Sequence, residues 1–248
     1  MEAAWVAALR GHDVTLWERS DRLGGNLVPG SASASKAEVK NLVSYLSHQM
    51  QKQGVRVELN RNADVESVRR HGADAVVLGL GASPLVPKMK GLEGDRVVSA
   101  VDVLSGKGET GKDVVVVGGG MVGCEAAEFL ASRGKRVTVV EMLERIAQDM
   151  GPTTRWVALR HLRELGVELL VSTRVVAVTE RGVVVEKNGE TSTVGADSVV
   201  LAVGLTPNRE LAESLANTVP ELHVVGDCRE VNKILEAVHE GWEVGRAL

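Results

Sequence analysis

The hydrophobic and polar positions of the chain form blocks with two different periods. A run of valines at 114–117 predicts a buried strand, and three closely spaced glycines follow it. The next residues predict a helix of roughly a dozen residues that ends at Gly134, before a second β-branched run at 137–140. This order of strand, helix and strand is typical of an α/β fold with parallel strands.

Two further segments have clear patterns. Residues 174–194 alternate between apolar and polar side chains, with turn residues at 180–182 and 188–189. This pattern predicts a small antiparallel meander. Residues 40–51 predict a helix.

The chain also contains an internal repeat. Residues 1–18 match residues 124–141 at an offset of 123, with identities that include Arg10/Arg133 and Glu18/Glu141. The same offset aligns residues 73–84 with residues 196–207. Two matching blocks at one offset indicate duplication of a unit of roughly 120 residues.

The start of the second unit resembles a phosphate-binding turn. Gly118, Gly120 and Gly123 form the pattern G-x-G-x-x-G between the predicted strand and helix. The first glycine permits a tight turn, the second lets phosphate oxygens approach the backbone, and the third lets helix and strand pack closely. The alternative is a glycine turn kept only for packing.

Glu141 supports the nucleotide interpretation. It lies eighteen residues after Gly123, at the end of the second predicted strand. A carboxylate in this position accepts hydrogen bonds from the ribose hydroxyls of an adenosine and repels a 2′-phosphate. The pattern therefore predicts an NAD(H) site.

The first unit has no counterpart of that turn. Through the repeat, Met1 corresponds to Cys124, so the expected first strand and glycine loop would precede residue 1, while Glu18 stands where Glu141 stands in the second unit. Three explanations are a fragment of a longer polypeptide, a misassigned start and a genuinely short chain. We favour the fragment and expect weakened nucleotide binding at this first site, because the main phosphate cradle is lost.

Composition and charge exclude other classes of function. The chain has 248 residues, a net charge of −4 and 2% aromatic residues, which argues against binding to nucleic acid. No apolar run approaches the ~20 residues that span a bilayer, and residues 1–14 have neither the basic n-region nor the cleavage site expected of a signal peptide. The two cysteines form no CxxC pair, and the six histidines have no metal-ligand spacing. We therefore expect a cytoplasmic protein without a metal site.

Several motifs together resemble those of the flavoprotein reductases with two dinucleotide-binding domains, the pyridine nucleotide-disulfide oxidoreductase superfamily. Besides the repeat, these motifs are "GGN" at 24–26, "VLGLGASP" at 77–84, "VLAVGLTPN" at 200–208 and "HVVGDC" at 223–228. In the second of them Gly79 and Leu80 replace the usual Ala and Thr. The tail from Val231 is most similar to the C-terminal module of the 2,4-dienoyl-CoA reductase, trimethylamine dehydrogenase and NADH:flavin oxidoreductase branch.

The resemblance implies two Rossmann-like domains, with the NAD domain inserted in the FAD domain. It places the FAD domain at 1–106 and 217–248, without its first strand and glycine loop, and the NAD domain at 107–216. The NAD site is then formed by Gly118, Gly120, Met121, Val122, Gly123, Glu141 and Gly204. The FAD site is formed by Glu18, Arg19, Gly25, Asn26, Val65, Gly81, Ala82, Gly226, Asp227, Ile234 and Leu235.

The function that the resemblance implies is an FAD-dependent NADH oxidoreductase module. Hydride transfer between nicotinamide and flavin belongs to the cofactors, so no catalytic side chain is expected. Because no cysteine pair follows the glycines at 24–25, we expect no disulfide reduction and expect electrons to pass to or from an N-terminal barrel with FMN and an iron–sulfur cluster. The alternatives are a nucleotide-binding module without catalysis, with ADP or nothing at the first site, and an inert, partly folded fragment.

Overall fold

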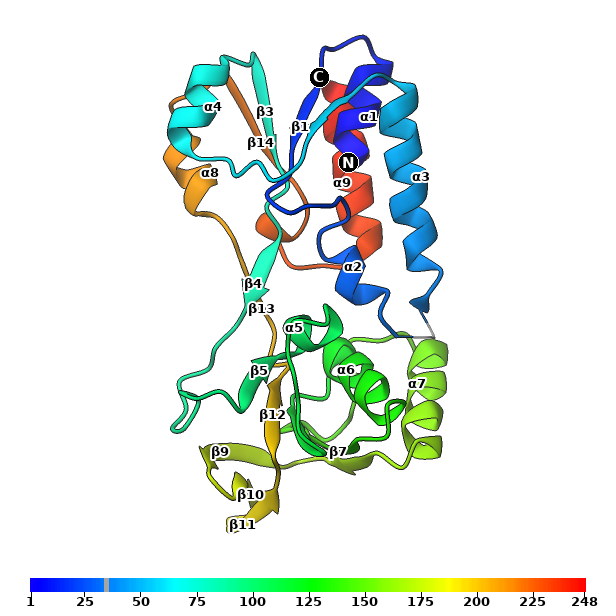
Figure 1. The fold of residues 1–248 in the computed structure, drawn as a ribbon, viewed down its shortest axis with the longest axis vertical. Helices are drawn as coiled ribbons and strands as arrows, with labels where there is room; N and C mark the ends of the chain where they lie inside the picture. Colours follow the sequence, from blue (N-terminus) through cyan, green and yellow to red (C-terminus); the bar gives the residue numbers. More distant parts are fainter. Residues whose placement is uncertain (34–35) are drawn as a thin grey trace. The chain divides into compact units, whose positions relative to one another are not determined.

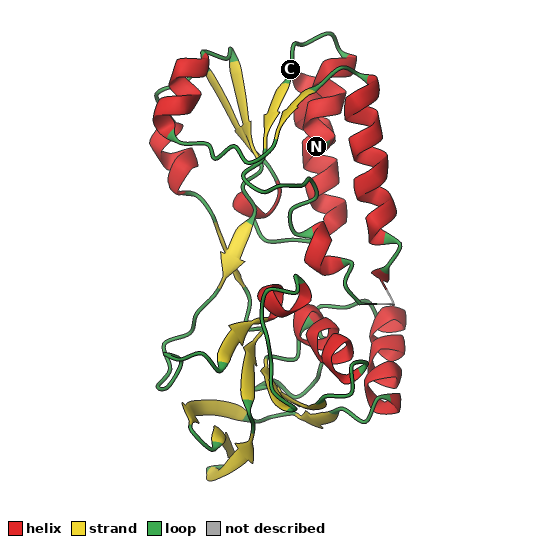
Figure 2. Cartoon of the chain, viewed as in Figure 1, coloured by secondary structure: helices red, strands yellow, loops and turns green. Residues whose placement is uncertain are grey.

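The computed structural model of the chain describes residues 1–33 and 36–248, which form two compact units (Figures 1 and 2). Unit 1 consists of Met1–Val28, Glu38–Ser83 and Leu205–Leu248, and unit 2 consists of Pro29–Ala37 and Pro84–Gly204. Each unit combines helices with parallel strands. The α/β class expected from the sequence is therefore confirmed.

Unit 2 is organised around one five-stranded parallel sheet. Its strand order is β5-β12-β6-β7-β8, so that β6 lies in the centre with β12 and β7 beside it. The elements of this unit are β5 (Val97–Ser99), α5 (Ala100–Leu104), β6 (Asp113–Val117), α6 (Met121–Ala131), β7 (Arg136–Val140), α7 (Pro152–Glu164), β8 (Glu168–Leu170), β9 (Arg174–Thr179), β10 (Gly182–Lys187), β11 (Glu190–Gly195) and β12 (Ser198–Leu201).

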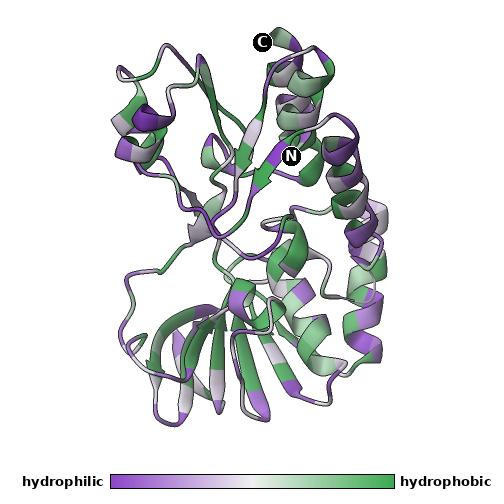
Figure 3. Cartoon of the chain, turned by 45° about the horizontal axis from the view of Figure 1, so that its top comes forward, coloured by the Kyte–Doolittle hydropathy of each residue, from purple (hydrophilic) through white to green (hydrophobic). Residues whose placement is uncertain are grey.

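The valines of β6 are buried on both faces of this sheet. Val114 and Val116 pack with residues of α5, α6 and α7, whereas Val115 and Val117 pack with residues of β9 and β10. This division follows from the two-residue period of a strand. A strand that is covered on both faces has a continuous run of apolar residues in its sequence. Figure 3 shows the strands of this sheet as mostly hydrophobic.

The antiparallel meander predicted over 174–194 is confirmed. Strands β9, β10 and β11 pair antiparallel in order, with Val183 opposite both Val178 and Val194. Val178 and Val183 are buried in the same cluster as Val115. The meander therefore covers the face of the parallel sheet that the helices leave open.

Unit 1 contains two separate parallel pairs, β1 with β2 and β3 with β14. A further ladder joins β4 to β13. The elements that belong to unit 1 or reach its boundaries are α1 (Glu2–Leu9), β1 (Thr15–Trp17), α2 (Leu27–Gly30), α3 (Val39–Lys52), β2 (Arg56–Glu58), α4 (Val65–His71), β3 (Ala75–Leu78), β4 (Ala82–Pro84), β13 (Leu205–Pro207), α8 (Glu210–Leu215), β14 (Glu221–Val224), the short 3-10 helix η2 (Gly226–Cys228) and α9 (Ile234–Ala247).

The internal repeat relates strands of unit 1 to strands of the five-stranded sheet of unit 2. Shifted by 123 residues, β7 overlaps β1 and β12 overlaps β3. In unit 2 the strand β6 pairs with both β7 and β12. Within residues 1–33 and 36–248, no strand pairs with both β1 and β3, so each of these strands has one edge without a partner strand.

The limits of the two compact units differ from the domain limits at 106/107 and 216/217 that the family resemblance implies. Strand β5 precedes residue 107 but pairs with β12 of unit 2, and α5 packs against α6. Helix α8 precedes residue 217 but packs against α4 and β14 of unit 1. The difference arises because pairing between distant segments, rather than the position of a motif, decides which residues form a compact unit.

None of the helices in the described part of the chain has the length and apolar character needed to cross a membrane.

Candidate functional site

The turn between β6 and α6 requires glycine at two positions. Gly118 has a φ of +103°, and a Cβ added there would lie 2.4 Å from the carbonyl oxygen of Ala202. A Cβ added to Gly123 would lie 1.9 Å from the carbonyl oxygen of Gly118. Both positions exclude any side chain, which is the packing that the sequence pattern predicts for the first and third glycines.

Helix α6 begins directly after this turn. Gly120 is its N-cap residue, with extended backbone and no side chain, and Met121 is the first helical residue. The face that carries Gly123, Cys124 and Ala127 is buried. The start of the helix presents main-chain N–H groups and the positive end of the helix dipole, which is a favourable place for an anion.

Glu141 lies beside the glycine turn. It follows β7 and is buried, with 8% of its surface exposed. One carboxylate oxygen accepts a hydrogen bond of 2.6 Å from the N–H of Gly119, and the other accepts one of 2.8 Å from the N–H of Leu143. Since a carboxylate has about four acceptor positions, these two bonds orient the group and leave it able to accept further hydrogen bonds.

The remaining predicted NAD residues lie near the same turn or beyond the end of β12. Val122 is the second residue of α6 and packs partly against the helical side of the core. Gly204 follows β12 with a φ of +114° and accepts a hydrogen bond from the N–H of Leu85. Gly204 is two residues after Ala202, which contacts the turn at Gly118.

Asp149 is a residue of this site that the sequence motifs did not indicate. Both of its carboxylate oxygens accept from the N–H of Met121, at 3.0 and 2.9 Å. The acidic residue falls in an irregular stretch between β7 and α7, where no periodic pattern exists. Asp149 is identified as a site residue only by its hydrogen bonds to Met121, which lies 28 residues earlier in the sequence.

A second feature that sequence reasoning missed is the ion pair between Lys36 and Glu125. Glu125 lies on α6, two residues after Gly123, and only 8% of it is exposed. Burial raises the pKa of its carboxyl, while the hydrogen bond and charge of Lys36 oppose that shift. The sequence did contain a signal for this ion pair, because Glu125 is an acidic residue on the buried face of an apolar helix. A buried carboxylate needs a partner that compensates its charge.

The cysteines of the chain are both buried. Burial, assisted by the nearby carboxylates of Asp149 and Glu125, raises the pKa of the Cys124 thiol to about 12. This thiol is therefore protonated at neutral pH and is a poor nucleophile. Among the described residues, no group of three His, Cys, Asp or Glu side chains is arranged to hold a metal ion.

In unit 1 the structure brings together residues from three of the predicted FAD motifs. The amide of Asn26 donates to the carboxylate of Asp227 at 3.3 Å and lies 3.7 Å from the place of a Cβ on Gly81. The second oxygen of Asp227 accepts from the N–H of Asn232 at 3.2 Å. Asn26, Gly81 and Asp227 thus form one polar cluster.

Two further predicted FAD residues near this cluster, Gly25 and Gly226, have a positive φ. Gly226 has a φ of +67°, and its N–H donates to the carboxylate of Glu240 at 2.8 Å. Glu240 also pairs with Arg229 at 3.2 Å. Gly25 precedes Asn26 with a φ of +49°, and Ala82 begins β4 directly after Gly81.

The other predicted FAD residues lie at the ends of neighbouring elements. Glu18 follows β1, and its carboxylate accepts from the N–H and the hydroxyl of Ser20, both at 2.8 Å. Arg19 is the exposed residue after it. Val65 begins α4, and the exposed Ile234 and Leu235 begin α9.

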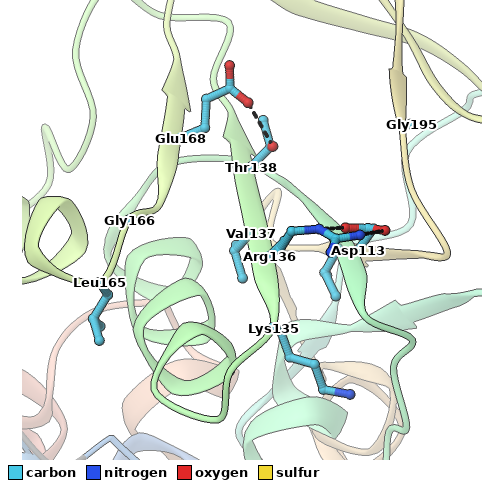
Figure 4. Close-up of a pocket in the computed structure, with 10 residues that line it drawn as sticks. Asp113, Lys135, Arg136, Val137, Thr138, Leu165, Gly166, Glu168 and Gly195 are labelled. Atoms are coloured by element: carbon cyan, nitrogen blue, oxygen red, sulfur yellow. Dashed lines mark hydrogen bonds and ion pairs between the residues drawn. The ribbon is translucent and has the colours of Figure 1, made fainter.

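A shallow polar hollow lies at the other end of the sheet of unit 2 (Figure 4). It is lined by residues at the amino ends of β6 and β7, which include Asp113 and Arg136 as an ion pair. Asp197 beside them accepts from the N–H groups of Lys112 and Asp113, and these bonds lower its pKa. Since the glycine turn follows the carboxyl end of β6, the hollow is no part of the predicted nucleotide site.

Comparison with known proteins gives a consistent result. The family described as "Pyridine nucleotide-disulphide oxidoreductase" matches residues 1–243. An "NADH oxidase" of Thermoanaerobacter brockii is 40% identical over 250 residues, and a "Cinnamate reductase" of Clostridium sporogenes is 36% identical over 249 residues. A solved complex of 2-naphthoyl-CoA reductase with 2-naphthoyl-CoA superposes with a TM-score of 0.97 at 32% identity.

These matches cover nearly all of this chain but only part of the other proteins. The two relatives match 98% and 99% of this chain, and the solved structure matches 100% of it. The chain in turn spans 38% of the NADH oxidase, 37% of the cinnamate reductase and 38% of the solved reductase.

Proposed function

The chain belongs to the pyridine nucleotide-disulphide oxidoreductase family, and from this premise we propose that it is an FAD-dependent NADH oxidoreductase module. In this proposal unit 2 binds NADH and unit 1 binds FAD. When bound, the two cofactors supply the hydride transfer between nicotinamide and flavin. The protein holds and orients them and contributes no catalytic side chain.

The observation that carries the proposal is the glycine turn of unit 2 with Glu141 beside it. The N–H groups at the start of α6 suit the pyrophosphate of a dinucleotide, since they combine main-chain hydrogen-bond donors with the positive end of a helix. The carboxylate of Glu141 is fixed by Gly119 and Leu143 on the side of the turn where β7 ends. We assign it to the ribose hydroxyls of the adenosine, with NADH preferred over NADPH.

The FAD assignment is supported by the cluster of Asn26, Gly81 and Asp227. These groups offer an amide and a carboxylate beside a glycine, and both polar groups suit the hydroxyls of a ribityl chain. The phosphate cradle of unit 1 would come from a strand between β1 and β3 and the turn after it. The repeat supports that strand, because β6 has this place in unit 2.

We further propose that the module works with a partner domain that carries FMN and an iron–sulfur cluster. The support is the greater length of the curated relatives, of which this chain spans less than two fifths. Electrons would pass between the FAD of unit 1 and that partner. The domain limits proposed from the motifs are 1–106 with 217–248 for FAD and 107–216 for NAD.

A second candidate function is a nucleotide-binding module without catalysis. It is favoured because, within residues 1–33 and 36–248, no strand pairs with both β1 and β3, whereas in unit 2 the phosphate-binding turn follows such a strand. In that case unit 2 binds NADH while unit 1 holds ADP or nothing. Flavin retention distinguishes the two candidates, since hydride transfer needs the flavin in its site.

The ribose assignment is tested with Glu141→Ala and Glu141→Gln. Loss of the carboxylate is expected to weaken NADH binding by about tenfold, because ribose hydroxyls lose a charged acceptor. Glu141→Gln keeps an acceptor for the Gly119 N–H and controls for damage to the turn. The measurement is NADH and NADPH titration by fluorescence. Unchanged NADH affinity in Glu141→Ala, with NADPH still unbound, would contradict the assignment.

A further inference from the structure

The first N–H of helix α6 already has an anionic partner. The carboxylate of Asp149 accepts from the N–H of Met121 with both oxygens, at 3.0 and 2.9 Å. One of these oxygens lies 3.3 Å from the place where a Cβ on Gly120 would be. The carboxylate therefore occupies the space beside the second glycine of the turn, where the proposed function places the pyrophosphate.

The backbone before Asp149 is attached to the same turn. The N–H of Ala147 donates to the carbonyl of Gly119 at 2.6 Å, and Ala147 is buried with a left-handed φ of +56°. The carbonyl of Ile146 accepts from the guanidinium of Arg155 at 2.7 Å. A non-glycine residue holds such a φ only where its surroundings stabilise it. This segment is thus fixed against the glycine turn and positions the carboxylate at the helix.

The side chain of Asp149, in contrast, is exposed. Rotation about its own side-chain bonds takes the carboxylate into water without moving Ile146 or Ala147. A carboxylate and a pyrophosphate cannot share one N–H, and two anions at such a short distance repel each other. Binding of one therefore requires release of the other.

We propose that Asp149 is a built-in competitor for the pyrophosphate of NADH. It caps α6 in the nucleotide-free protein and leaves when the nucleotide binds, so it lowers the affinity of the site. This inference rests on the proposed function, because it concerns the same site. A purely structural cap would instead stabilise the helix and leave NADH affinity unchanged.

The test compares Asp149→Asn with wild type and with Glu144→Gln. Asparagine keeps the shape of the side chain and an acceptor oxygen, but it removes the negative charge that the positive end of the helix dipole stabilises. Glu144 is an exposed residue of the same segment, and its substitution makes the same change in net charge without touching α6. Fluorescence titration with NADH at constant ionic strength gives the affinities of the full chain.

Asp149→Asn is expected to bind NADH about three- to thirtyfold more tightly, with Glu144→Gln within about twofold of wild type. Without nucleotide, Asp149→Asn is expected to unfold at a lower temperature, because the cap is weakened. Inorganic pyrophosphate, used as a competitor of NADH, should show the same gain. Adenosine should show none, since it carries no phosphate.

Three results would overturn the inference. They are equal or weaker NADH binding by Asp149→Asn, equal gains in Glu144→Gln, and an equal gain for adenosine. If wild type binds NADH and one of these results is found, only the role of Asp149 is wrong. If neither wild type nor the variants bind NADH, the proposed function fails and the inference fails with it.

Discussion

At the scale of single residues, the site depends on groups whose neighbours are far away in sequence. Gly118 and Gly123 were predictable, because their roles follow from a local pattern of strand, turn and helix. Asp149 and Lys36 were not, since their partners Met121 and Glu125 lie 28 and 89 residues away. No periodicity marks such pairs, and only the folded backbone brings them together.

The buried Glu125 makes stability depend on pH. Burial raises the pKa of this carboxyl in the folded protein above its ordinary value of 4.5. A group whose pKa is raised on folding contributes stability that is complete below the unfolded pKa and is lost as pH rises through the folded pKa. The folded state therefore loses stability from Glu125 as pH rises above about 4.5.

Glu125→Gln removes this titration. The free energy of unfolding of wild type minus that of Glu125→Gln is expected to fall as pH rises from about 4.5, by at most about 1.4 kcal/mol per pH unit, and then to level off. Denaturant unfolding between pH 4 and pH 8 measures it, with the exposed Glu190→Gln as the control for loss of a charge. A difference that stays flat or increases with pH would show that burial of Glu125 does not govern its titration.

At the scale of elements, helices α1 and α9 approach closely through small residues. A Cβ on Gly245 would lie 2.6 Å from the carbonyl oxygen of Ala3, and one on Gly241 would lie 3.0 Å from the Cβ of Glu2. Both glycines are buried. Such spacing leaves no room for a methyl group at Gly245, so the two helices would have to separate.

Gly245→Ala is therefore expected to destabilise the protein by about 1–3 kcal/mol, although alanine is the better helix former. Gly30→Ala serves as the control, since a Cβ there meets no atom within 4 Å. Thermal and denaturant unfolding of both variants measure the effect. Stability of Gly245→Ala equal to that of wild type would contradict the close packing of α1 on α9.

The elements themselves were largely predictable where their patterns are long and regular. The strand at 114–117, the helix after it and the meander at 174–194 are present. The limits of the compact units were less predictable. Strand β5 is assigned by its pairing with β12, and α8 by its packing against α4, and a sequence pattern contains neither contact.

At the scale of the whole molecule, the two units differ in one respect that bears on function. Unit 2 has a central strand β6 that leads into the glycine turn. In unit 1, within the described residues, β1 and β3 have no strand that joins them. NADH binding is therefore proposed for unit 2, and flavin binding by unit 1 is the property that distinguishes the two candidate functions.

The most direct measurement is the visible absorption spectrum of the purified chain after incubation with excess FAD and desalting, before and after anaerobic NADH addition. We expect a retained flavin band that NADH bleaches, with much slower bleaching in Glu141→Ala at the same NADH concentration. A retained band that NADH does not bleach would contradict hydride transfer. Loss of the flavin on desalting, with NADH binding still detectable, would contradict the reductase and identify a nucleotide-binding module instead.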